Sequence, residues 1–403
     1  MPDLDSRLAR SRADLLDEIE QPPLATVRRR ATRIRRRRAV TAGAAALALL
    51  GVVAIGVRPW QQDTTPSVTA TDPSVTAPVY RGGGIDIIGL SPAPVHGLNG
   101  PIAEVEFSDE GVGIAAAGCD RNCPPLARTT DGGLSWSSVA QSPTGDGPMD
   151  VIAFPAGHWL VQGDRWWSSQ TGSTWQVVTP PPATDRAVIE PGELPRVDQP
   201  LGAIGVLSWD RGPLGPLATQ PGLTARWVAP APAGDGAWWV GGLVGTAPAV
   251  AVSRDSGRSW TTTVLPTPAD PAETVTVSTL GVEVYAMARN GAGEVLGIYH
   301  SADGGKRFTP TFVASGGDNA PAPFTGDPVP LLDGRLLVIQ SAGKPSSWWA
   351  SADDGKTFIP IVDLPAASWI RRTYAGYVAY GLFGGSWAAF STDGTNWQKL
   401  QLN

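Results

Sequence analysis

The sequence feature that most constrains the fold of this chain is a short motif that returns along its C-terminal part. Each copy begins with Ser or Thr, has Asp two residues later, continues through one or two Gly, and ends on Trp or Phe. Five complete copies occupy residues 129–136, 253–260, 301–308, 351–358 and 391–397. A degenerate copy at 168–175 has Gln170 in place of Asp, and a weaker copy at 218–224 has Gln220 there.

The chemistry of the motif is that of a turn between two strands. The Asp carboxylate accepts hydrogen bonds from nearby backbone amides, and Gly adopts the positive φ angles that tight turns require. The aromatic residue covers apolar surface between neighbouring sheets. The predicted turn residues are Asp131, Asp255, Asp303, Asp353 and Asp393, with Trp136, Trp175, Trp260, Phe308, Phe358 and Trp397 as their aromatic partners. None of these roles requires a substrate.

The spacing of the copies predicts the architecture. The seven motif positions recur on average every ~44 residues, which is typical of the four-stranded blades of a β-propeller. The 48 Gly and 38 Pro residues disfavour a helical protein. We therefore predict an all-β, seven-bladed propeller, with six blades as the alternative if the region around Gln220 is an insertion. Residues 80–90 either add a strand to the last blade or pack beneath the ring.

Residues 100–403 resemble the Asp-box (BNR) repeat β-propellers, because five motif copies match that family's turn. The superfamily includes sialidases, sortilin-type receptors, certain endoglucanases and photosystem II assembly factors. The resemblance implies the fold but says little about function, because the same turn occurs in enzymes and in receptors.

The N-terminal part of the chain predicts a membrane anchor. Residues 1–38 hold eleven Arg and form a basic tail, with a short helix expected near the start. The uncharged run at 39–57 would span roughly 28 Å as a helix, close to the hydrocarbon thickness of a bilayer. We interpret residues 58–79 as a Ser/Thr/Pro-rich stalk and residues 80–403 as the propeller. A cleaved signal peptide is the main alternative, and a basic patch for nucleic acid is a weaker one.

The Arg cluster should stay on the cytoplasmic side of the membrane, which places the propeller outside the cell. Arg outnumbers Lys 27 to 4, a composition typical of a bacterial genome rich in G and C. The expected location is therefore the bacterial cell membrane, with a single span and an extracellular C-terminal domain.

Cys119 and Cys123 lie close together in the sequence and predict a local disulfide in an oxidising compartment. A zinc site would need further ligands, but the three His residues are scattered. No nucleotide-binding motif is present, so we expect neither a cofactor nor a metal.

Catalytic residues are harder to identify. The sialidases of the resembled superfamily carry an Arg triad and a Tyr nucleophile, and the nearest match is Arg371, Arg372 and Tyr374. Glu283 and Tyr285 would share one face of a strand. The resemblance to sialidases also implies an acidic Asp near the first blade, where Asp86 and Asp109 lie without a clear match. A two-carboxylate glycosidase could draw on the acids of presumed loops, namely Asp185, Glu190, Glu193, Asp198 and Asp318. The simpler interpretation is that these side chains are solvated surface residues.

The sequence thus favours a binding or scaffolding module for an extracytoplasmic protein or glycan. The alternative is a glycoside hydrolase, sialidase-like or with two carboxylates. A third hypothesis is that residues 1–20 contact a cytoplasmic protein. Nucleic acid is not an expected partner.

Overall fold

A computed structural model of the chain describes residues 79–89, 102–117, 126–143, 149–198, 201–266, 268, 270–313, 324–340, 347–380 and 388–400. The predicted tail, the apolar segment 39–57 and nearly all of the stalk lie outside these residues. Within the described part of the chain, no helix is long and apolar enough to cross a membrane.

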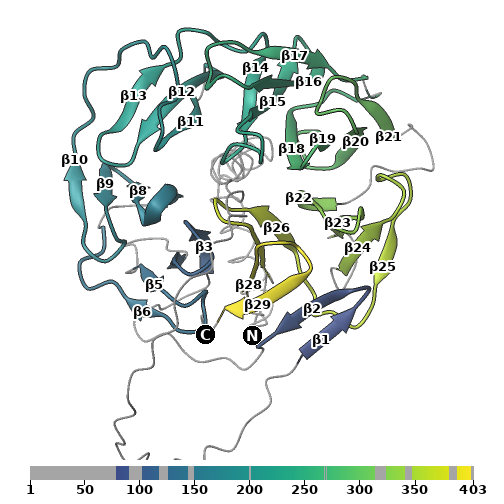
Figure 1. Cartoon of the computed structure of the whole chain (residues 1–403), viewed down its shortest axis with the longest axis horizontal. Coiled ribbons are helices and arrows are strands. Elements are labelled where there is room, and N and C mark those ends of the chain that lie inside the picture. The colour runs from purple at the N-terminus through teal and green to yellow at the C-terminus, as the bar shows by residue number, and fades with distance from the viewer. Residues whose placement is uncertain are drawn as a thin grey trace, which may run out of the picture.

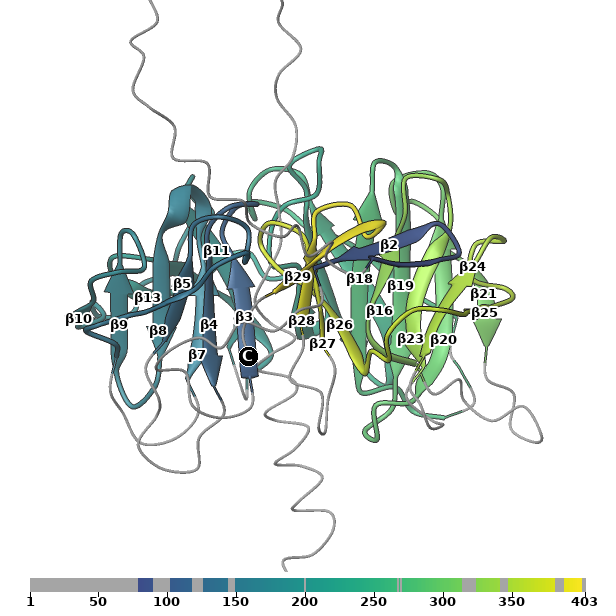
Figure 2. The same ribbon diagram turned by 90° about the horizontal axis from the view of Figure 1, so that it is seen from below.

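Seven antiparallel sheets are arranged in a ring, so the protein is an all-β, seven-bladed propeller (Figure 1). This confirms the predicted blade count. Seen from the side, the molecule is a disc (Figure 2). The described residues include one helical turn, the 3-10 helix η1 (Pro155–Gly157).

Blades 1 and 2 have four strands each: β3 (Ile102–Phe107), β4 (Gly113–Ala117), β5 (Ala127–Thr129) and β6 (Ser137–Ser138), then β7 (Asp150–Ala153), β8 (Trp159–Gln162), β9 (Trp166–Ser169) and β10 (Gln176–Val178). Blade 3 has β11 (Glu193–Asp198), β12 (Ala203–Ser208) and β13 (Gly212–Pro216). Blade 4 has β14 (Thr224–Val228), β15 (Trp238–Val244), β16 (Ala247–Ser253) and β17 (Thr261–Val264).

Blade 5 has β18 (Thr274–Leu280), β19 (Glu283–Arg289), β20 (Val295–Ser301) and β21 (Thr309–Val313). Blade 6 has β22 (Phe324–Pro330), β23 (Leu336–Gln340), β24 (Ser347–Ser351) and β25 (Ile359–Ile361). Blade 7 has β26 (Trp369–Arg372), β27 (Tyr377–Tyr380), β28 (Ala388–Ser391) and β29 (Asn396–Leu400), and it is extended by β1 (Val79–Gly82) and β2 (Ile85–Ile88).

The central strands are buried on both faces because each blade is covered by its two neighbours. In β19, for example, every residue from Val284 to Arg289 is buried. Large aromatic side chains fill the spaces between blades, and Trp348 of blade 6 meets Trp397 of blade 7 edge to face at 5.3 Å. The packing is close enough to require glycine: a Cβ on Gly305 would lie 2.2 Å from the ring of Trp239 in the preceding blade.

Blade 3 departs from the pattern that the motif spacing predicts. The weak copy around Gln220 lies between β13 and β14, in two different sheets, and so does not form the hairpin we expected. Instead, the Gln220 amide accepts from the Ile204 amide at 2.6 Å and donates to the Leu217 carbonyl at 2.6 Å. The outer side of β13 is covered by an earlier segment, because Arg186 forms a parallel bridge with Leu217.

Residues 79–88 form a hairpin that extends blade 7, which settles the two alternatives for this segment. Strand β2 runs parallel to β29, with Asp86 opposite Asn396. The hairpin also reaches blade 6, where the Arg335 side chain donates to the Gly83 carbonyl. It therefore ties the first described residues to the last two blades.

The ring closes where blade 7 meets blade 1. The rings of Phe107 and Phe390 stack at 3.9 Å, and the Arg371 guanidinium reaches across to Glu104, at 3.0 Å, and to Glu106. All three charged side chains are buried. Burial alone would lower the pKa of Arg371, but Glu106 and Glu104 raise it above its ordinary value. Burial also raises the pKa of Glu106, against the opposing pull of Arg371.

The buried charges at the ring closure lead to a testable prediction about stability. Arg371→Ala would leave two buried carboxyl groups without their cation, so we expect the free energy of unfolding to fall by about 3–5 kcal/mol in chemical denaturation. Arg81→Ala is the control, because its 3.1 Å ion pair with Asp86 is exposed and should contribute less than about 1 kcal/mol. Equal losses in the two variants would contradict the closing role of Arg371.

Candidate functional site

The five aspartate turns, at Asp131, Asp255, Asp303, Asp353 and Asp393, join the third strand of a blade to the fourth. In the turn of blade 6, the Ser351 hydroxyl donates to Asp353 Oδ1 at 2.7 Å and accepts from the Gly355 amide at 2.8 Å. Asp353 also accepts from the amide and the hydroxyl of Thr357, at 2.8 and 2.7 Å. The carboxylate is therefore fully engaged in holding its own turn.

The degenerate turn of blade 2 keeps the leading hydroxyl but lacks the carboxylate. Ser169 accepts from the Gly172 amide at 2.8 Å, as the equivalent residues do elsewhere. Gln170 is exposed, and a hydroxyl pair between Thr171 and Ser173, 2.6 Å apart, occupies the far side of the turn.

The aromatic residues that follow the turns are buried to different degrees. Trp397 is almost completely buried, and its indole N–H donates to the Gly394 carbonyl at 2.8 Å. The others are half-buried, namely Trp136, Trp175, Trp260, Phe308 and Phe358. Each still packs against one of the apolar clusters between blades.

The hydrogen bonds at the aspartate turns lower the pKa of their carboxyl groups. Bonds from Ser259 and from Thr357 bring the pKa of Asp255 and of Asp353 to about 2. Burial raises the pKa of Asp131, but the bonds from Ser135 outweigh it and the net shift is downward. Asp303 and Asp393 also have lowered pKa values.

The residues nearest to a sialidase constellation do not form an accessible site. Arg371 is buried in the ring closure, and the backbone amide of Arg372 donates to Asp327 at 3.2 Å. Tyr374 is 9% exposed and packs in an apolar cluster with blades 1 and 2. Burial raises the pKa of Tyr374 to about 12, which disfavours the phenolate form that a nucleophile needs.

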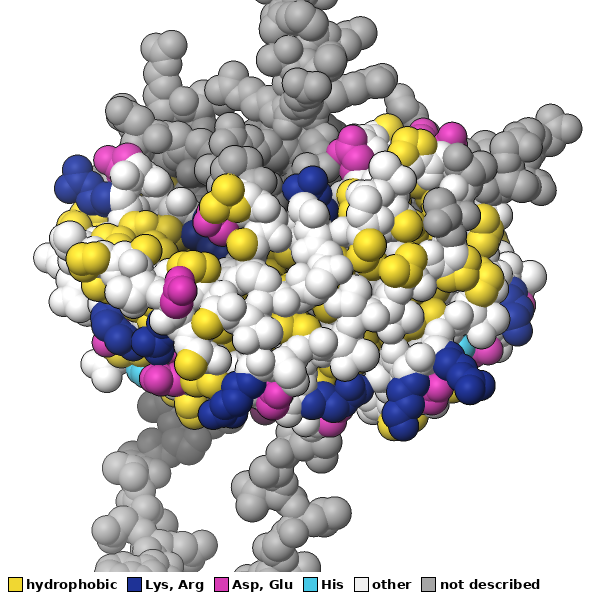
Figure 3. Space-filling view, turned by 90° about the horizontal axis from the view of Figure 1, so that it is seen from above, with side chains coloured by type: hydrophobic (Ala, Val, Ile, Leu, Met, Phe, Trp, Pro, Cys, Tyr) yellow, Lys and Arg dark blue, Asp and Glu magenta, His cyan; other side chains and the backbone are white. Residues whose placement is uncertain are grey.

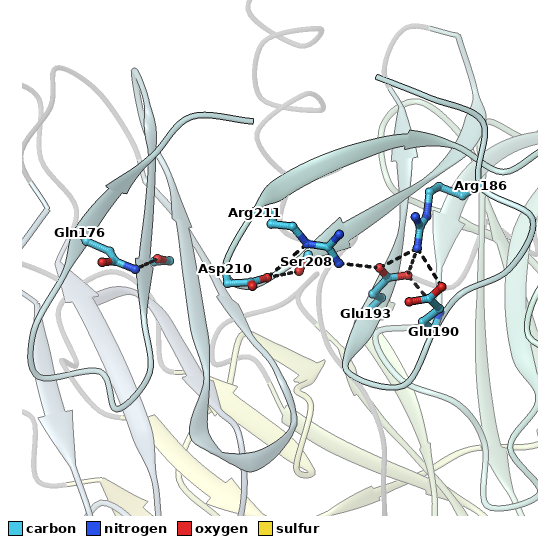
Figure 4. Close-up of polar contacts among 8 residues, drawn as sticks. Gln176, Arg186, Glu190, Glu193, Ser208, Asp210 and Arg211 are labelled. Carbon is cyan, nitrogen blue, oxygen red and sulfur yellow. Dashed lines mark hydrogen bonds and ion pairs between the residues drawn. The ribbon is translucent and has the colours of Figure 1, made fainter. Parts of the chain in front are cut away.

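Two of the predicted loop acids do meet, in blade 3 (Figure 4). Arg186 contacts Glu193 at 3.0 Å and Glu190 at 3.3 Å, and Arg211 contacts Glu193 at 3.2 Å. Glu193 is buried, and its second oxygen accepts from the Glu190 amide at 3.0 Å. Both oxygens of Glu193 thus have partners within the protein, as a structural ion-pair network requires.

The remaining predicted acids are separated from one another. Asp109 caps its own loop by accepting from the amides of Gly111 and Val112 at 2.8 and 2.7 Å. Asp86 pairs with Arg81, and Asp185 and Asp198 are exposed. Asp318, Cys119 and Cys123 lie outside the described residues. Within the described part of the chain, no group of three or more His, Cys, Asp or Glu side chains is arranged to hold a metal ion.

Sequence reasoning did not identify a cluster of aromatic and basic side chains between blades 2 and 3. We call it the Trp–Arg seam, and it consists of His158, Trp166, Arg196, Trp209 and Arg211. The imidazole of His158 stacks on Trp209 at 4.2 Å, and the guanidinium of Arg196 lies 5.2 Å from the centre of the Trp166 ring. Arg196 also donates to Gln162, so the contacts join the two blades.

Arg211 follows Trp209 closely in the sequence, and its side chain is 49% exposed and pairs with Asp210 and Glu193. Trp166 and Trp209 are half-buried against the apolar cluster beneath them. The repeated pair Trp166-Trp167 was the available sequence signal, but nothing in the sequence indicated that Trp166 would lie beside Arg196 of the next blade. The side of the disc shown in Figure 3 has a mixed edge, where Lys and Arg alternate with Asp and Glu.

No family model matches this chain, and no curated protein does. Among solved structures, YCF48 from Cyanidioschyzon merolae is similar over 75% of this chain and 96% of its own length, at 13% sequence identity and a TM-score of 0.44. YCF48 bound to a D1 peptide is similar over 55% of this chain and 83% of its own length, at 16% identity and a TM-score of 0.35. Similarity this distant carries no argument about function.

The lowered pKa values of the aspartate turns predict that the folded protein loses stability in acid. An unfolded Asp has a pKa of about 3.9, so the depressed values stabilise the fold above that pH, and this stability is lost as the pH falls from about 4 to 2. We expect the urea midpoint to fall across this window, and to fall less in Asp255→Asn and Asp353→Asn. Asp185→Asn, in an exposed loop, is the control and should keep the wild-type slope. Identical slopes in all four proteins would contradict the role of the turns.

Proposed function

We propose that this chain is a protein-binding β-propeller that docks its partner on the Trp–Arg seam. The observation that carries the proposal is the concentration of half-buried Trp and partly exposed Arg at one junction between blades. Trp and Arg are the residues that most often dominate binding energy at protein interfaces. A rigid ring can present them without a large ordering cost.

The chemistry of the seam supports a protein partner over a glycan. Sugars bind to tryptophan by stacking on an open ring face, but His158 already stacks on Trp209, and Arg196 lies over Trp166. Arg211 and Asp210, which are half-exposed, instead offer a donor and an acceptor at the rim of an apolar surface. That arrangement resembles the polar rim of a protein interface.

A hydrolase function has less support. Glu193 is fully engaged by Arg186 and Arg211, and Tyr374 and Arg371 are buried. A two-carboxylate glycosidase needs two acids that face one substrate-accessible space. Asp86, Glu190 and Glu193 form ion pairs instead, and Asp109 caps its own loop.

Site-specific cross-linking tests the docking surface. Benzoylphenylalanine replacing Trp209 should capture one dominant partner in cells, whereas the same replacement of Val264, an exposed residue of β17, should not. With the purified partner, Arg211→Glu should weaken binding about tenfold or more. Arg307→Glu, on an exposed turn of blade 5, should leave it unchanged. Equal capture at positions 209 and 264, or equal affinity of both Glu variants, would reject the seam.

We further propose that residues 39–57 anchor the propeller outside a bacterial cell and that the ring belongs with the Asp-box propellers. The support is the uncharged 19-residue run after an Arg cluster, and the repeated carboxylate-centred turns. In intact spheroplasts, added protease should digest the propeller, and the chain should sediment with membranes after washing at high salt. A propeller that stays intact in whole spheroplasts and is digested only after lysis would reject this orientation.

A further inference from the structure

His300 lies where blade 5 meets the aspartate turn of blade 6. It is on β20, directly opposite Tyr285 on β19, and the two rings stack at 4.6 Å. Its Nε2 atom contacts Glu283 of the same blade, and its Nδ1 atom lies 3.8 Å from the Asp354 carboxylate of blade 6. The His300 side chain is 13% exposed, so these contacts are largely shielded from water.

Asp354 has a backbone conformation that usually selects glycine. Its φ angle is +62°, and the equivalent residues of blades 1 and 5 are Gly132 and Gly304, at +71° each. Blade 4 has Ser256 there, at +59°, and its carbonyl accepts from the Ile189 amide of the preceding segment at 2.8 Å. In both of these blades the residue contacts an earlier part of the chain, Asp354 through its carboxylate and Ser256 through its backbone carbonyl. The contact offsets the cost of the left-handed conformation.

Each ring nitrogen of His300 faces one carboxylate, Nε2 that of Glu283 and Nδ1 that of Asp354. Both carboxylates can interact with an N–H only when each ring nitrogen carries a proton. A neutral imidazole has a single N–H, which the closer contact with Glu283 retains on Nε2, and the lone pair of Nδ1 then faces Asp354. A protonated imidazole presents an N–H to each carboxylate. Histidine is the side chain whose charge ordinarily changes near neutral pH.

We propose that His300 is a pH-sensitive clasp between blades 5 and 6. When the imidazole is protonated, its cation holds Glu283 and Asp354 together. When the imidazole is neutral, it releases Asp354 and loosens the turn of blade 6. The device regulates the stability of one blade junction and is separate from the Trp–Arg seam.

Two groups beside the clasp, Tyr285 and Asp353, do not change charge over the pH range of the test. The titratable neighbours of His300, within the described contacts, are Glu283, Asp354 and Tyr285, and Thr309 is its partner on β21. Burial, together with Asp354 and Glu283, raises the pKa of Tyr285 to about 12, so its phenol stays neutral. Asp353, which holds the turn itself, has a pKa of about 2 and stays ionised.

Amide hydrogen exchange of the full chain tests the clasp. The turn at 353–358 includes the Thr357 amide, which donates to Asp353, and its opening reports on the junction. After correction for the intrinsic rate at each pH, we expect its protection factor to be about two- to fivefold higher at pH 5.5 than at pH 8.5. Asp354→Asn tolerates the left-handed conformation but removes the charge, and should abolish this difference.

Two further variants separate the clasp from general effects of pH. Asp354→Gly should also abolish the pH difference, because it removes the carboxylate that contacts His300 and suits the left-handed backbone conformation. Ser256→Gly makes the same change in a turn without histidine and should act equally at both pH values. The clasp is wrong if Asp354→Asn retains the wild-type pH difference, or if the turn at 255–260 shows the same difference. His300→Gln replaces the imidazole by a side chain that stays neutral at every pH and should also abolish the pH difference. If this variant does not fold, the Asp354 variants still test the clasp.

Discussion

The physical constraint on which this structure depends is that each blade is apolar on both faces. A central strand such as β19 is buried along nearly its whole length, so it needs a blade on either side. Only a closed ring meets that requirement for every blade. The junction of blades 1 and 7 therefore matters most, and it combines stacked Phe107 and Phe390 with a buried Arg371 shared by two carboxyl groups. The hairpin at 79–88 pairs with β29, the strand at the opposite edge of blade 7 from β26, and so extends that blade.

The aspartate turns stabilise the blades locally and also link them. Within a turn, the carboxylate replaces water as the acceptor of backbone amides. Between turns, the Arg254 side chain donates to the Gly304 carbonyl of the next blade at 2.7 Å, and Arg128 donates to the Thr171 carbonyl at 2.6 Å. His300 and Asp354 form an inter-blade contact of the same kind, but one that responds to pH. A motif that appears purely local in the sequence thus contributes to the cohesion of the whole ring.

The proposed docking surface coincides with the two blades that have lost the regular motif. Blade 2 has Gln170 in place of the aspartate, and in blade 3 the segment around Gln220 leaves the expected hairpin. A repeat protein can vary where a blade is irregular without weakening the regular blades, because each blade contacts only its neighbours. This separation explains why the strong motifs carry the fold and say little about function.

The sequence by itself determined the place of five turns and favoured seven blades over six, because these depend on local chemistry and on a regular spacing. It left open whether residues 80–90 add a strand to the last blade or pack beneath the ring, which the pairing of β2 with β29 decided. It misassigned the turn at Gln220, since a glutamine that bonds to a distant backbone cannot be distinguished from a degraded aspartate. Only the tertiary structure decided that Arg371 and Tyr374 are buried, that Glu190 and Glu193 share Arg186, and that His300 faces two carboxylates. Such contacts join residues far apart in the chain, or on different blades. They are set by how the blades rotate about the ring, which no local pattern records.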